Sequence, residues 1–559
     1  MSAAESYRRF LACVKEDALL TELRSLEGNE AEIAARFSEE LSFGTAGLRG
    51  IIGVGTSRMN VYTVSRATFG LWDVVSARVV DRVPVFVIGY DTRNMSDVFA
   101  RRTAEVLASR GAQVYLAAEP IPVPFVSFAT RALGADAGVC ITASHNPAAY
   151  NGYKVFDSTG SQLLEDDAMA VSRAAAEHDY FEQVVCGKGE IAQIPQSVID
   201  AYFAGLSSRF SKREEELTVV YTPLCGTGLR FVPRALSDAG FSAVHLVEAQ
   251  ARHDGNFPTC EKPNPEVRAS LKLAEELAEK VGADVFLATD PDCDRVGVGV
   301  RVEGGYRLLT GNETGLLLMD HLLSEAKKAG RLTPSTFVCT TIVSAPMADA
   351  LAASYGVTLC RTLTGFKYIG EQMGRLEREG REEDFLFGFE ESYGCVASTA
   401  VRDKDACEAC VLVCRLAAAL KREGKTLADA LKDLEARFGV YRNDLKNYEF
   451  TSREAEEASK RTLSSLRSGF PQTFAGFETT EVFDCLNLVK TTSDGKTEPI
   501  LLPRADVLSF SSGERARVMM RPSGTEPKVK LYLFAHANTE EECDGILARL
   551  SEYSDSLFG

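Results

Sequence analysis

The feature that most constrains the fold is a recurring alternation of short apolar segments with helical patterns. Residues 83–90 form an apolar run with strand character, and a polar loop and a helical pattern follow it as far as Arg110. Residues 113–117 and 137–142 are the next two strand candidates. Strand, loop, helix and strand at this spacing are typical of doubly wound α/β units.

The same alternation begins again twice further along the chain. Residues 217–222 and 284–289 are strand candidates, and residues 226–228 open a helix between them. Residues 336–341 then predict another strand, which is followed by a helix over residues 345–355. The predicted fold class is therefore α/β, with three similar α/β units along the chain.

The two ends of the chain differ from this pattern. Residues 1–40 look helical, whereas residues 518–520 and 529–534 flank a polar loop and predict a smaller α+β domain. A chain of 559 residues exceeds what one hydrophobic core usually supports, so several domains are expected. The predicted parts are a helical extension (1–40), domain 1 (41–210), domain 2 (211–330), domain 3 (331–445) and domain 4 (446–559).

Charge and composition exclude several classes of partner. The formal net charge is −17, and an acidic surface argues against nucleic acid or an anionic membrane, because both require cationic patches. The N-terminal sequence lacks the apolar core of a signal peptide, and no apolar run reaches the roughly 18 residues of a transmembrane helix. We therefore expect a cytoplasmic enzyme.

Cysteine usage fits the same compartment. The 14 cysteines are scattered, and only Cys407, Cys410 and Cys414 repeat at the spacing of one helix face. Buried thiols in a reducing compartment explain this spacing better than a zinc or redox site, which would need further ligands nearby.

The sharpest motif is the sequence TASHNP at residues 142–147. It follows a strand candidate directly, where α/β proteins place ligand sites, so we expect the hydroxyl of Ser144 to be exposed. Pro147 keeps the preceding residue out of helix and fixes a turn. A serine protease is excluded, because the adjacent Ser144 and His145 cannot adopt nucleophile–base geometry and no GxSxG elbow is present.

A second motif, DPDCDR at residues 290–295, also follows a strand candidate. Asp290, Asp292 and Asp294 are costly to bring together unless a cation neutralises them, and a set of oxygen ligands favours Mg²⁺ or Ca²⁺. An EF-hand is excluded because Arg295 stands where its loop requires glycine. A solvated acidic turn is the alternative.

Three further loops are suited to anions or sugars. The sequence RPSGTEPK at residues 521–528 combines a guanidinium fork with hydroxyl and backbone N–H donors for a phosphate. Residues 388–394, GFEESYG, carry carboxylate and hydroxyl groups between glycines, which suits sugar hydroxyls. Residues 44–50, GTAGLRG, would let the backbone and Arg49 approach a phosphate. Taken alone, a polar hairpin loop explains residues 521–528 equally well, and a charged surface turn is favoured for residues 388–394. A glycine-rich loop such as residues 44–50 is weak evidence by itself.

Together, the five motifs in this order resemble the α-D-phosphohexomutase family, from about residue 40 to the C-terminus. The resemblance implies four domains around a central cleft, of which the first three are related α/β domains with mixed sheets and the fourth is an α+β domain. It also implies a phosphoserine at Ser144 and a Mg²⁺ ion held by Asp290, Asp292, Asp294 and the serine phosphate. Residues near the transferring group would be Arg49, His145, Lys154 and Lys404. Substrate would be bound by Thr364, Gly365, Glu390, Ser392, Arg295, Arg521, Ser523, Gly524, Thr525 and Lys528.

The resemblance also implies the reaction, in which glucose 1-phosphate and glucose 6-phosphate are interconverted through glucose 1,6-bisphosphate, which also activates the enzyme. Lys154 or Lys404 could serve as general base only with a lowered pKa, and His145 is a third candidate, for which a structural hydrogen bond is favoured. The implied partners are small sugar phosphates, and the implied state is a monomer or weak dimer.

Details of the motifs point to one branch, which contains bacterial-type phosphoglucomutases, eukaryotic phosphopentomutases and a glucose-1,6-bisphosphate synthase. Ser392 favours a hexose, because pentomutase members tend to carry a small apolar residue there. Cys395 stands where phosphomannomutase-like members have histidine, which leaves Lys404 as the acid–base candidate. Glu390 and Ser392 are expected to bind the hydroxyls on C3 and C4, which glucose and mannose share.

Several alternatives remain open. Within the family they are phosphomannomutase, phosphopentomutase and glucose-1,6-bisphosphate synthase. A haloacid-dehalogenase-type phosphatase would use Asp290 as nucleophile, although its motif usually has Thr or Val where this chain has Asp294. An inactive structural paralogue should have lost a key group, whereas Ser144 and all three aspartates are present.

Overall fold

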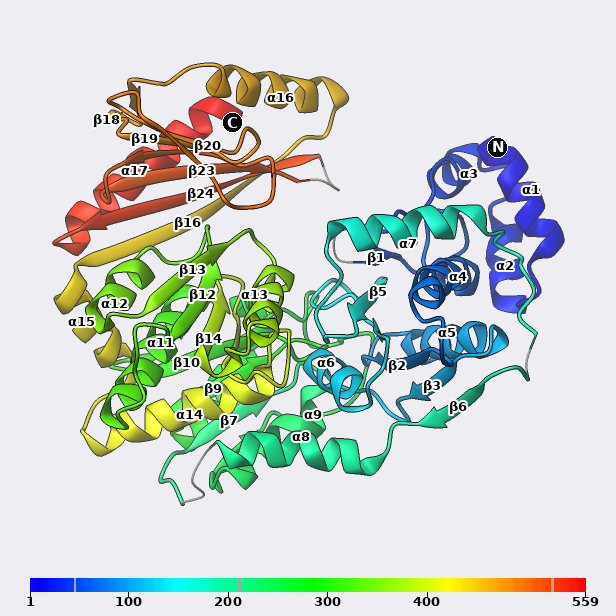
Figure 1. The fold of residues 1–559 in the computed structure, drawn as a ribbon, viewed down its shortest axis with the longest axis horizontal. Helices are drawn as coiled ribbons and strands as arrows, with labels where there is room; N and C mark the ends of the chain where they lie inside the picture. The colour runs from blue at the N-terminus through cyan, green and yellow to red at the C-terminus, as the bar shows by residue number, and fades with distance from the viewer. Residues whose placement is uncertain (45–46, 186, 210–213, 524–526) are drawn as a thin grey trace. The chain divides into compact units, whose positions relative to one another are not determined.

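The protein is described from a computed structural model, which describes residues 1–44, 47–185, 187–209, 214–523 and 527–559. The chain forms two compact units (Figure 1). The first contains Met1–Leu318 and Phe366–Thr426, and the second contains Met319–Gly365 and Leu427–Gly559. The predicted domain boundaries at residues 40, 210, 330 and 445 stay predictions.

The chain begins with three helices, as predicted for residues 1–40. They are α1 (Ala3–Cys13), α2 (Asp17–Ser25) and α3 (Glu30–Phe37). Ser2 begins α1 with a capping box, in which its hydroxyl accepts from the Glu5 amide while the Glu5 carboxylate accepts from the Ser2 amide. The helices enclose a small core in which the rings of Phe10 and Phe37 pack edge to face at 5.2 Å.

A mixed six-stranded sheet, ordered β1-β5-β4-β2-β3-β6, follows in the first unit. Its strands are β1 (Leu48–Ile51), β2 (Val85–Tyr90), β3 (Gln113–Leu116), β4 (Ala137–Ile141), β5 (Tyr150–Asp157) and β6 (Glu190–Gln193). Strands β2, β3, β4 and β6 are parallel, and β5 runs antiparallel to both β4 and β1. The predicted strands at 83–90, 113–117 and 137–142 are confirmed as β2, β3 and β4.

Helices cover both faces of this sheet (Figure 1). Their bounds are α4 (Val61–Arg78), α5 (Ser96–Ser109), α6 (Val123–Ala132) and α7 (Glu165–Glu177). Phe86 and Ile88 of β2 pack with α4, α5 and α7, whereas Gly89 faces Ile121 and Val126 beside α6. The alternation of side chains along β2 thus divides the core into two layers.

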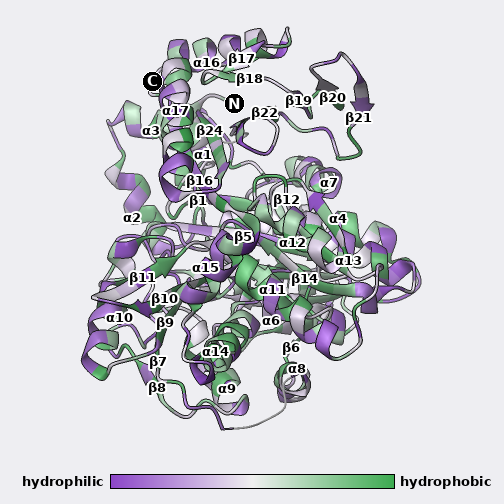
Figure 2. Ribbon diagram, turned by 90° about the vertical axis from the view of Figure 1, so that its left-hand side faces the viewer, coloured by the Kyte–Doolittle hydropathy of each residue, from purple (hydrophilic) through white to green (hydrophobic). Residues whose placement is uncertain are grey.

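A five-stranded sheet, ordered β11-β10-β9-β7-β8, forms the next part of the first unit. Its strands are β7 (Val219–Thr222), β8 (Val244–Leu246), β9 (Val285–Thr289), β10 (Val296–Val302) and β11 (Gly305–Leu309). The helices of this part are α8 (Gln196–Ser208), α9 (Gly228–Asp238), α10 (Arg268–Val281) and α11 (Gly311–Lys328), whose last ten residues belong to the second unit. Figure 2 shows the hydrophilic outer side of α10, whose Leu271, Ala274 and Ala278 pack inward.

The second chain segment of the first unit, Phe366–Thr426, completes that unit. It forms α13 (Phe366–Arg378), the antiparallel pair β14 (Phe385–Glu390) and β15 (Gly394–Val396), and α14 (Ala406–Arg422). Cys407, Cys410 and Cys414 are buried along α14, which confirms the predicted helix face of free thiols.

The second unit contains the parallel strands β12 (Phe337–Thr341) and β13 (Thr358–Thr362), with α12 (Met347–Tyr355) and α15 (Leu427–Phe438). Its larger part is a seven-stranded sheet ordered β16-β24-β23-β22-β19-β20-β21. The bounds are β16 (Val440–Glu449), β19 (Glu481–Asp484), β20 (Val489–Thr492), β21 (Thr497–Pro499), β22 (Leu508–Ser512), β23 (Ala516–Pro522) and β24 (Lys528–Ala537). A small hairpin, β17 (Thr473–Phe474) and β18 (Phe477–Glu478), and the helices α16 (Arg453–Arg467) and α17 (Glu540–Phe558) complete the unit.

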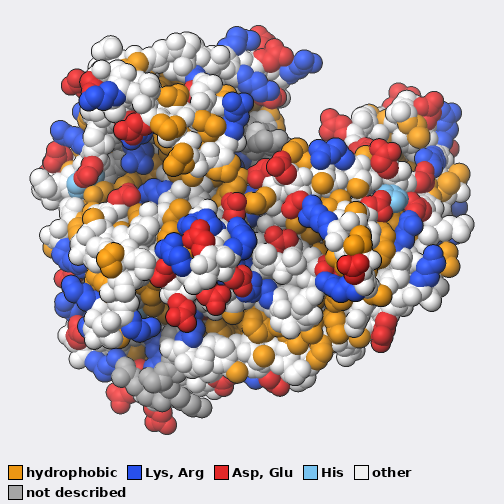
Figure 3. Space-filling model, in the orientation of Figure 1, with side chains coloured by type: hydrophobic (Ala, Val, Ile, Leu, Met, Phe, Trp, Pro, Cys, Tyr) orange, Lys and Arg blue, Asp and Glu red, His pale blue; other side chains and the backbone are white. Residues whose placement is uncertain are grey.

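The surface carries charges of both signs. On the face shown in Figure 3, basic and acidic side chains are interspersed rather than gathered into one patch of either sign. Within the described ranges, no helix has the length and apolar character needed to cross a bilayer.

His178 joins two parts of the first sheet domain by two ion pairs. It follows α7, and its Nε2 lies 2.7 Å from Asp73 of α4, while its Nδ1 lies 2.7 Å from Glu182. The ring stacks on Phe69 at 5.2 Å. Burial opposes the charge of the imidazole, but the hydrogen bonds and charges of Glu182 and Asp73 outweigh it and raise the pKa of His178.

This pairing predicts a pH dependence of stability. A raised folded-state pKa stabilises the protein fully below the unfolded pKa of about 6.5, and this contribution is lost as the pH rises through the folded pKa. The free energy of unfolding, measured by urea denaturation from about pH 6 to pH 9, should therefore fall more steeply in the wild type than in His178→Gln. The exposed His245 of β8 supplies the control His245→Gln. Equal slopes for wild type and His178→Gln would contradict the assignment.

Candidate active site

Ser144 lies in the loop that leaves the C-terminal end of β4. Its backbone adopts a left-handed φ of 51°, which a non-glycine residue rarely does. The Thr142 hydroxyl accepts a hydrogen bond from the Ser144 amide at 2.8 Å, and the Asn146 amide donates to Ala143 at 3.1 Å, so the turn is fixed from both sides. Ser144 is 3% exposed. The expectation of an exposed hydroxyl is therefore wrong, because the next loop covers it.

The covering loop leaves the C-terminal end of β9 and carries the three aspartates. Asp290, Asp292 and Asp294 are buried, and one carboxylate oxygen from each lies within 4.8 Å of the others. The amides of Asp294 and Arg295 both donate to Oδ1 of Asp290 at 3.1 Å. Cys293, at a left-handed φ of 56°, turns the chain so that alternate side chains converge. The predicted carboxylate triplet is brought together.

The triplet fits a divalent cation. Within the described part of the chain, Oδ1 of Asp292 and Oδ1 of Asp294 are buried and accept no hydrogen bond. Burial raises the pKa of Asp290 well above its usual range, and the charges of Asp292 and Asp294 raise it further. Mg²⁺ and Ca²⁺ bind to converging carboxylate oxygens of this kind, which accept no hydrogen bond from the residues described.

The serine and the carboxylates meet directly. The hydroxyl of Ser144 donates to Oδ2 of Asp290 at 2.9 Å, and the Thr142 hydroxyl donates to Oδ2 of Asp292 at 3.1 Å. A phosphoryl group on the Ser144 oxygen would thus lie beside any cation held by the triplet. The aspartate loop is also held at the start of α6, where the Val123 amide donates to the carbonyl of Asp292 at 2.9 Å.

Two buried lysines supply part of the positive charge beside the triplet. Nζ of Lys154, on β5, lies 2.8 Å from Asp292 and 3.2 Å from Asp294. Nζ of Lys404 lies 3.2 Å from Asp294 and 3.6 Å from Glu390. Burial lowers the pKa of both lysines, but the surrounding carboxylates outweigh it and raise both pKa values. This direction is opposite to the lowered pKa that we expected of a general base.

The remaining predicted groups around Ser144 are also in place. Nδ1 of His145 lies 3.1 Å from the Ser144 hydroxyl, and burial followed by the charges of Arg295 and Arg49 lowers the pKa of His145 to about 2. The imidazole is therefore neutral. Arg49, on β1, donates to the side chain of Asn146 at 3.3 Å, and Nε of Arg295 lies 4.0 Å from Asp290 while its guanidinium pairs with Glu266.

The predicted sugar loop lies next to Lys404. Glu390 ends β14, and its carboxylate accepts from the Ser392 hydroxyl at 2.7 Å. Gly394 begins β15, and a Cβ atom there would lie 1.8 Å from Cδ of Lys404. The glycine therefore leaves the space through which the Lys404 side chain reaches Asp294.

The other predicted substrate groups belong to the second unit. Gly365 has a left-handed φ of 117° and follows Thr364 at the end of that unit's first segment. Arg521 lies near the end of β23, and the Ser523 amide donates to the carbonyl of Lys528 at 2.8 Å. Gly524 and Thr525 fall outside the described residues. The role of this loop in binding phosphate stays a prediction.

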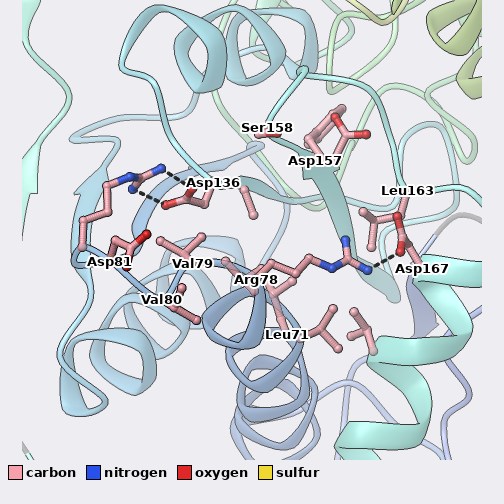
Figure 4. Close-up of a pocket in the computed structure, with 16 residues that line it drawn as sticks. Leu71, Arg78, Val79, Val80, Asp81, Asp136, Asp157, Ser158, Leu163 and Asp167 are labelled. Atoms are coloured by element: carbon pink, nitrogen blue, oxygen red, sulfur yellow. Dashed lines mark hydrogen bonds and ion pairs between the residues drawn. The ribbon is translucent and has the colours of Figure 1, made fainter.

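A pocket of about 540 Å³ lies elsewhere in the first unit (Figure 4). It is lined by apolar side chains of α4 together with charged side chains that pair with one another: Arg78 with Asp167, and Arg82 with Asp136 at 2.6 Å. None of the predicted site residues lines it. We therefore do not assign the reaction to this pocket, although its volume suits a small ligand.

Sequence reasoning missed two groups that the structure places in the site. Thr142 bridges the two loops through its hydroxyl, and Asp403 lies 3.5 Å from Nζ of Lys404. Thr142 belongs to the TASHNP motif, so its position carried a signal. Asp403 lies in a charged stretch that reads equally well as a surface turn.

Comparison with known proteins decides the family. Models of the phosphoglucomutase/phosphomannomutase α/β/α domains I, II and III match residues 40–181, 200–304 and 310–438. A phosphoglucomutase of Staphylococcus haemolyticus is 36% identical over 517 residues, covering 90% of this chain and 92% of the relative. The chain belongs to the phosphoglucomutase/phosphomannomutase family. It is a mutase by this membership. The predicted α/β class with three α/β domains is confirmed, and the C-terminal domain, predicted as α+β, is rich in strands.

Two further proteins agree with this membership. A phosphoglucomutase of Staphylococcus epidermidis (strain ATCC 12228 / FDA PCI 1200) is 35% identical, covering 93% of this chain and 94% of the relative. The crystal structure of a phosphoglucomutase/phosphomannomutase family protein from Burkholderia thailandensis has a TM-score of 0.70 at 18% identity, covering 93% of this chain and 97% of that one. The second likeness concerns the fold alone.

The close packing at Gly394 predicts a sharp effect of one methyl group. Gly394→Ala should push Lys404 away from Asp294 and Glu390, and a displacement of this kind in an active site can lower kcat by about 100-fold. Gly374→Ala is the matched control, because the nearest atom to a Cβ at Gly374 would lie 3.4 Å away. Since Gly374 lies within α13, alanine there should raise the free energy of unfolding by about 0.5–1 kcal/mol. Steady-state kinetics and thermal unfolding of both variants test this. Wild-type kcat in Gly394→Ala would contradict it.

Proposed function

We propose that the protein is a phosphoglucomutase that interconverts glucose 1-phosphate and glucose 6-phosphate through a phosphorylated Ser144. The observation that supports this most is the 2.9 Å contact between the Ser144 hydroxyl and Asp290 within a buried carboxylate triplet. Relatives named phosphoglucomutase at 35–36% identity over most of the chain support the same reaction.

The proposed cation is Mg²⁺, held by Asp290, Asp292, Asp294 and an oxygen of the serine phosphate. When bound, it would neutralise the triplet and withdraw charge from the transferring phosphoryl group. Phosphoryl transfer places negative charge on the equatorial oxygens, so positioned cationic groups account for much of the catalysis. Lys154 and Arg295 lie within 4.0 Å of the triplet and supply that charge.

The proposed cycle balances over two transfers. In the first, the bond between phosphorus and the Ser144 oxygen breaks while a bond forms from phosphorus to the free sugar hydroxyl, whose proton passes to a base. The bound product is glucose 1,6-bisphosphate, which then presents its other phosphate. In the second transfer the bond from that phosphorus to its sugar oxygen breaks while a bond forms to the Ser144 oxygen. The Ser144 hydroxyl proton passes to the base, and the sugar oxygen takes up a proton, as the Ser144 oxygen does in the first transfer. Free glucose 1,6-bisphosphate is the proposed activator.

The charges in the site bear on the identity of the base. Lys154 and Lys404 are protonated while they face bare carboxylates, because those carboxylates raise their pKa values. A cation on the triplet would remove the cause of that rise. We therefore propose that cation binding prepares Lys404 to accept the sugar proton, while neutral His145 donates a hydrogen bond from Nδ1 to the Ser144 oxygen and orients it.

The remaining properties follow as proposals from the same reading. Glu390 and Ser392 are the proposed contacts of the sugar hydroxyls, and the loop of residues 521–528 is the proposed site of the distal phosphate. Cytoplasmic location, a monomeric or weakly dimeric state, and the absence of nucleic acid and membrane partners stay predictions. Phosphomannomutase, phosphopentomutase and glucose-1,6-bisphosphate synthase remain the alternatives.

Removal of the proposed phosphate carrier should abolish turnover. In an assay coupled to glucose 6-phosphate dehydrogenase, with Mg²⁺ and glucose 1,6-bisphosphate present, Ser144→Ala should lose more than about 1,000-fold in kcat, because the covalent step cannot occur. Ser65→Ala is the control, since Ser65 is buried and donates only to the Val61 carbonyl of its own helix. Undiminished turnover in Ser144→Ala would exclude the mechanism, and phosphate trapped on Asp290 instead would favour the phosphatase alternative.

The substrate is settled by comparing kcat/KM for glucose, mannose, ribose and deoxyribose 1-phosphates under identical Mg²⁺ conditions. We expect glucose 1-phosphate to be preferred over the pentose phosphates by at least about tenfold, because Ser392 offers a hydroxyl partner that a hexose can use. The control is Ser392→Ala, which should reduce the preference for glucose over the pentoses. A preference of the wild type for either pentose phosphate would contradict the assignment as a hexose mutase.

A further inference from the structure

The two terminal nitrogens of one buried guanidinium point into the loop that carries Ser144. Arg93 lies just after β2, and its side chain is fully buried. Its two terminal nitrogens donate to four backbone carbonyls of one loop. The acceptors are the carbonyls of Ser144 at 2.6 Å, Pro147 at 2.9 Å, Tyr150 at 3.1 Å and Asn146.

This placement is costly unless the charge is compensated. Burial lowers the pKa of Arg93, and the opposite charge of Asp91, whose Oδ2 lies 3.3 Å from Nε, acts against that shift. Asp91 is itself held by the Ser96 hydroxyl at 2.7 Å and by the Arg93 amide at 2.9 Å. A planar guanidinium can serve several carbonyls at once, which a lysine ammonium cannot do with the same geometry.

The other side of the guanidinium is covered by an aromatic ring from the five-stranded part of the unit. The Arg93 guanidinium carbon lies 5.0 Å from the ring centre of Phe257, within the range of a cation–π contact. Phe257 is 2% exposed and has a left-handed φ of 46°. The approach is close, because a Cβ on Gly255 would lie 2.4 Å from the Asn94 amide, and the Asn94 side chain donates to Asn256 at 2.9 Å.

The four carbonyls belong to a loop whose conformation matters for the reaction. Ser144 is held at a φ of 51°, a conformation that persists only where its surroundings enforce it. From that conformation its hydroxyl reaches Asp290 at 2.9 Å. A shift of the loop would change the distance between the phosphate carrier and the carboxylate triplet.

We propose that Arg93, backed by the ring of Phe257, is a positioning residue that holds the Ser144 loop at the distance from the carboxylate triplet that phosphoryl transfer requires. This inference rests on the proposed function of Ser144. Arg93 does not touch the reacting atoms. It acts through the backbone carbonyls on both sides of the turn.

The chain contains a closely matched arginine for comparison. Arg66 of α4 also donates to backbone carbonyls, those of Ala175 and His178 at 3.0 Å and of Ala176 at 3.2 Å. Its guanidinium also stacks on an aromatic ring, that of Tyr180 at 4.4 Å. Arg66 holds the end of α7, and among the described residues its other partners are Glu40 and the Tyr180 hydroxyl rather than residues of the site. Arg66→Ala therefore measures what the loss of such a clamp does to stability alone.

The test compares Arg93→Ala with Arg66→Ala in steady-state kinetics with and without guanidinium chloride below its denaturing range. We expect kcat of Arg93→Ala to fall by roughly 10- to 100-fold with KM for glucose 1-phosphate nearly unchanged, because only the alignment of the carrier is lost. Guanidinium should enter the vacated site and restore part of kcat. Arg66→Ala should keep wild-type kcat and show no such rescue.

Amide hydrogen exchange of residues 142–152, followed by mass spectrometry, supplies a readout that does not depend on turnover. Exchange in this segment should be faster in Arg93→Ala than in wild type and should slow again with guanidinium. If Arg93→Ala does not fold, Arg93→Lys and Phe257→Leu take its place, and both should show a lowered kcat, an unchanged KM and faster exchange in the same segment.

The outcomes separate the two proposals. A folded Arg93 variant with wild-type kcat, or one whose lost kcat is accompanied by unchanged exchange and no guanidinium rescue, would overturn the positioning role. Wild-type kinetics and exchange in both Arg93→Lys and Phe257→Leu would overturn it equally. A wild-type protein without mutase turnover would instead contradict the proposed function, while the exchange measurement would still report whether Arg93 holds the loop.

Discussion

The site depends on positive charge that compensates the mutual repulsion of three buried carboxylates. Asp290, Asp292 and Asp294 converge within 4.8 Å while buried, an arrangement that is unfavourable without positive charge at the same point. Lys154 and Lys404 provide part of it at 2.8–3.2 Å. Two carboxylate oxygens still accept no hydrogen bond from the described residues, and together they fit the ligand set of a divalent cation.

The fold forms this site by bringing together the carboxyl ends of strands from two sheets. The Ser144 loop follows β4 and the aspartate loop follows β9, which is where α/β proteins place their ligand sites. Left-handed backbone at Ser144 and Cys293 turns each loop sharply so that the side chains face one another. Arg93 then holds the Ser144 loop through its backbone carbonyls, and Thr142 holds it through the Ser144 amide.

Much of this arrangement could be predicted from the sequence. Strands β2, β4 and β9 are short apolar runs that end in polar motifs, and the alternate spacing of the three aspartates indicates convergence on a cation. Strand β5 escaped prediction because Asn151 and Gly152 read as a turn. Gly152 is instead needed within the strand, since a Cβ there would lie 2.4 Å from the Thr142 carbonyl, and Lys154 follows two residues later.

Other features depend on contacts between residues far apart in the chain. The burial of Ser144 arises from a loop 146 positions away, and the raised pKa values of Lys154 and Lys404 arise from aspartates that the sequence places in another domain. The role of Arg93 is set by carbonyl groups, which every residue has, so the residue types of the loop give no signal for it. Periodicity and motif spacing do not report such partners.

The central claim is that the Ser144 oxygen carries a phosphoryl group directly beside a cation bound to the triplet. It is tested most directly by phosphorus NMR of the protein after phosphorylation by glucose 1,6-bisphosphate, with diamagnetic Mg²⁺ replaced stepwise by paramagnetic Mn²⁺. We predict one phosphoserine resonance, absent from Ser144→Ala, that broadens strongly as Mn²⁺ binds and stays sharp when Asp292→Asn removes a ligand. A phosphoserine resonance that remains sharp in the wild type with Mn²⁺ bound would contradict the account.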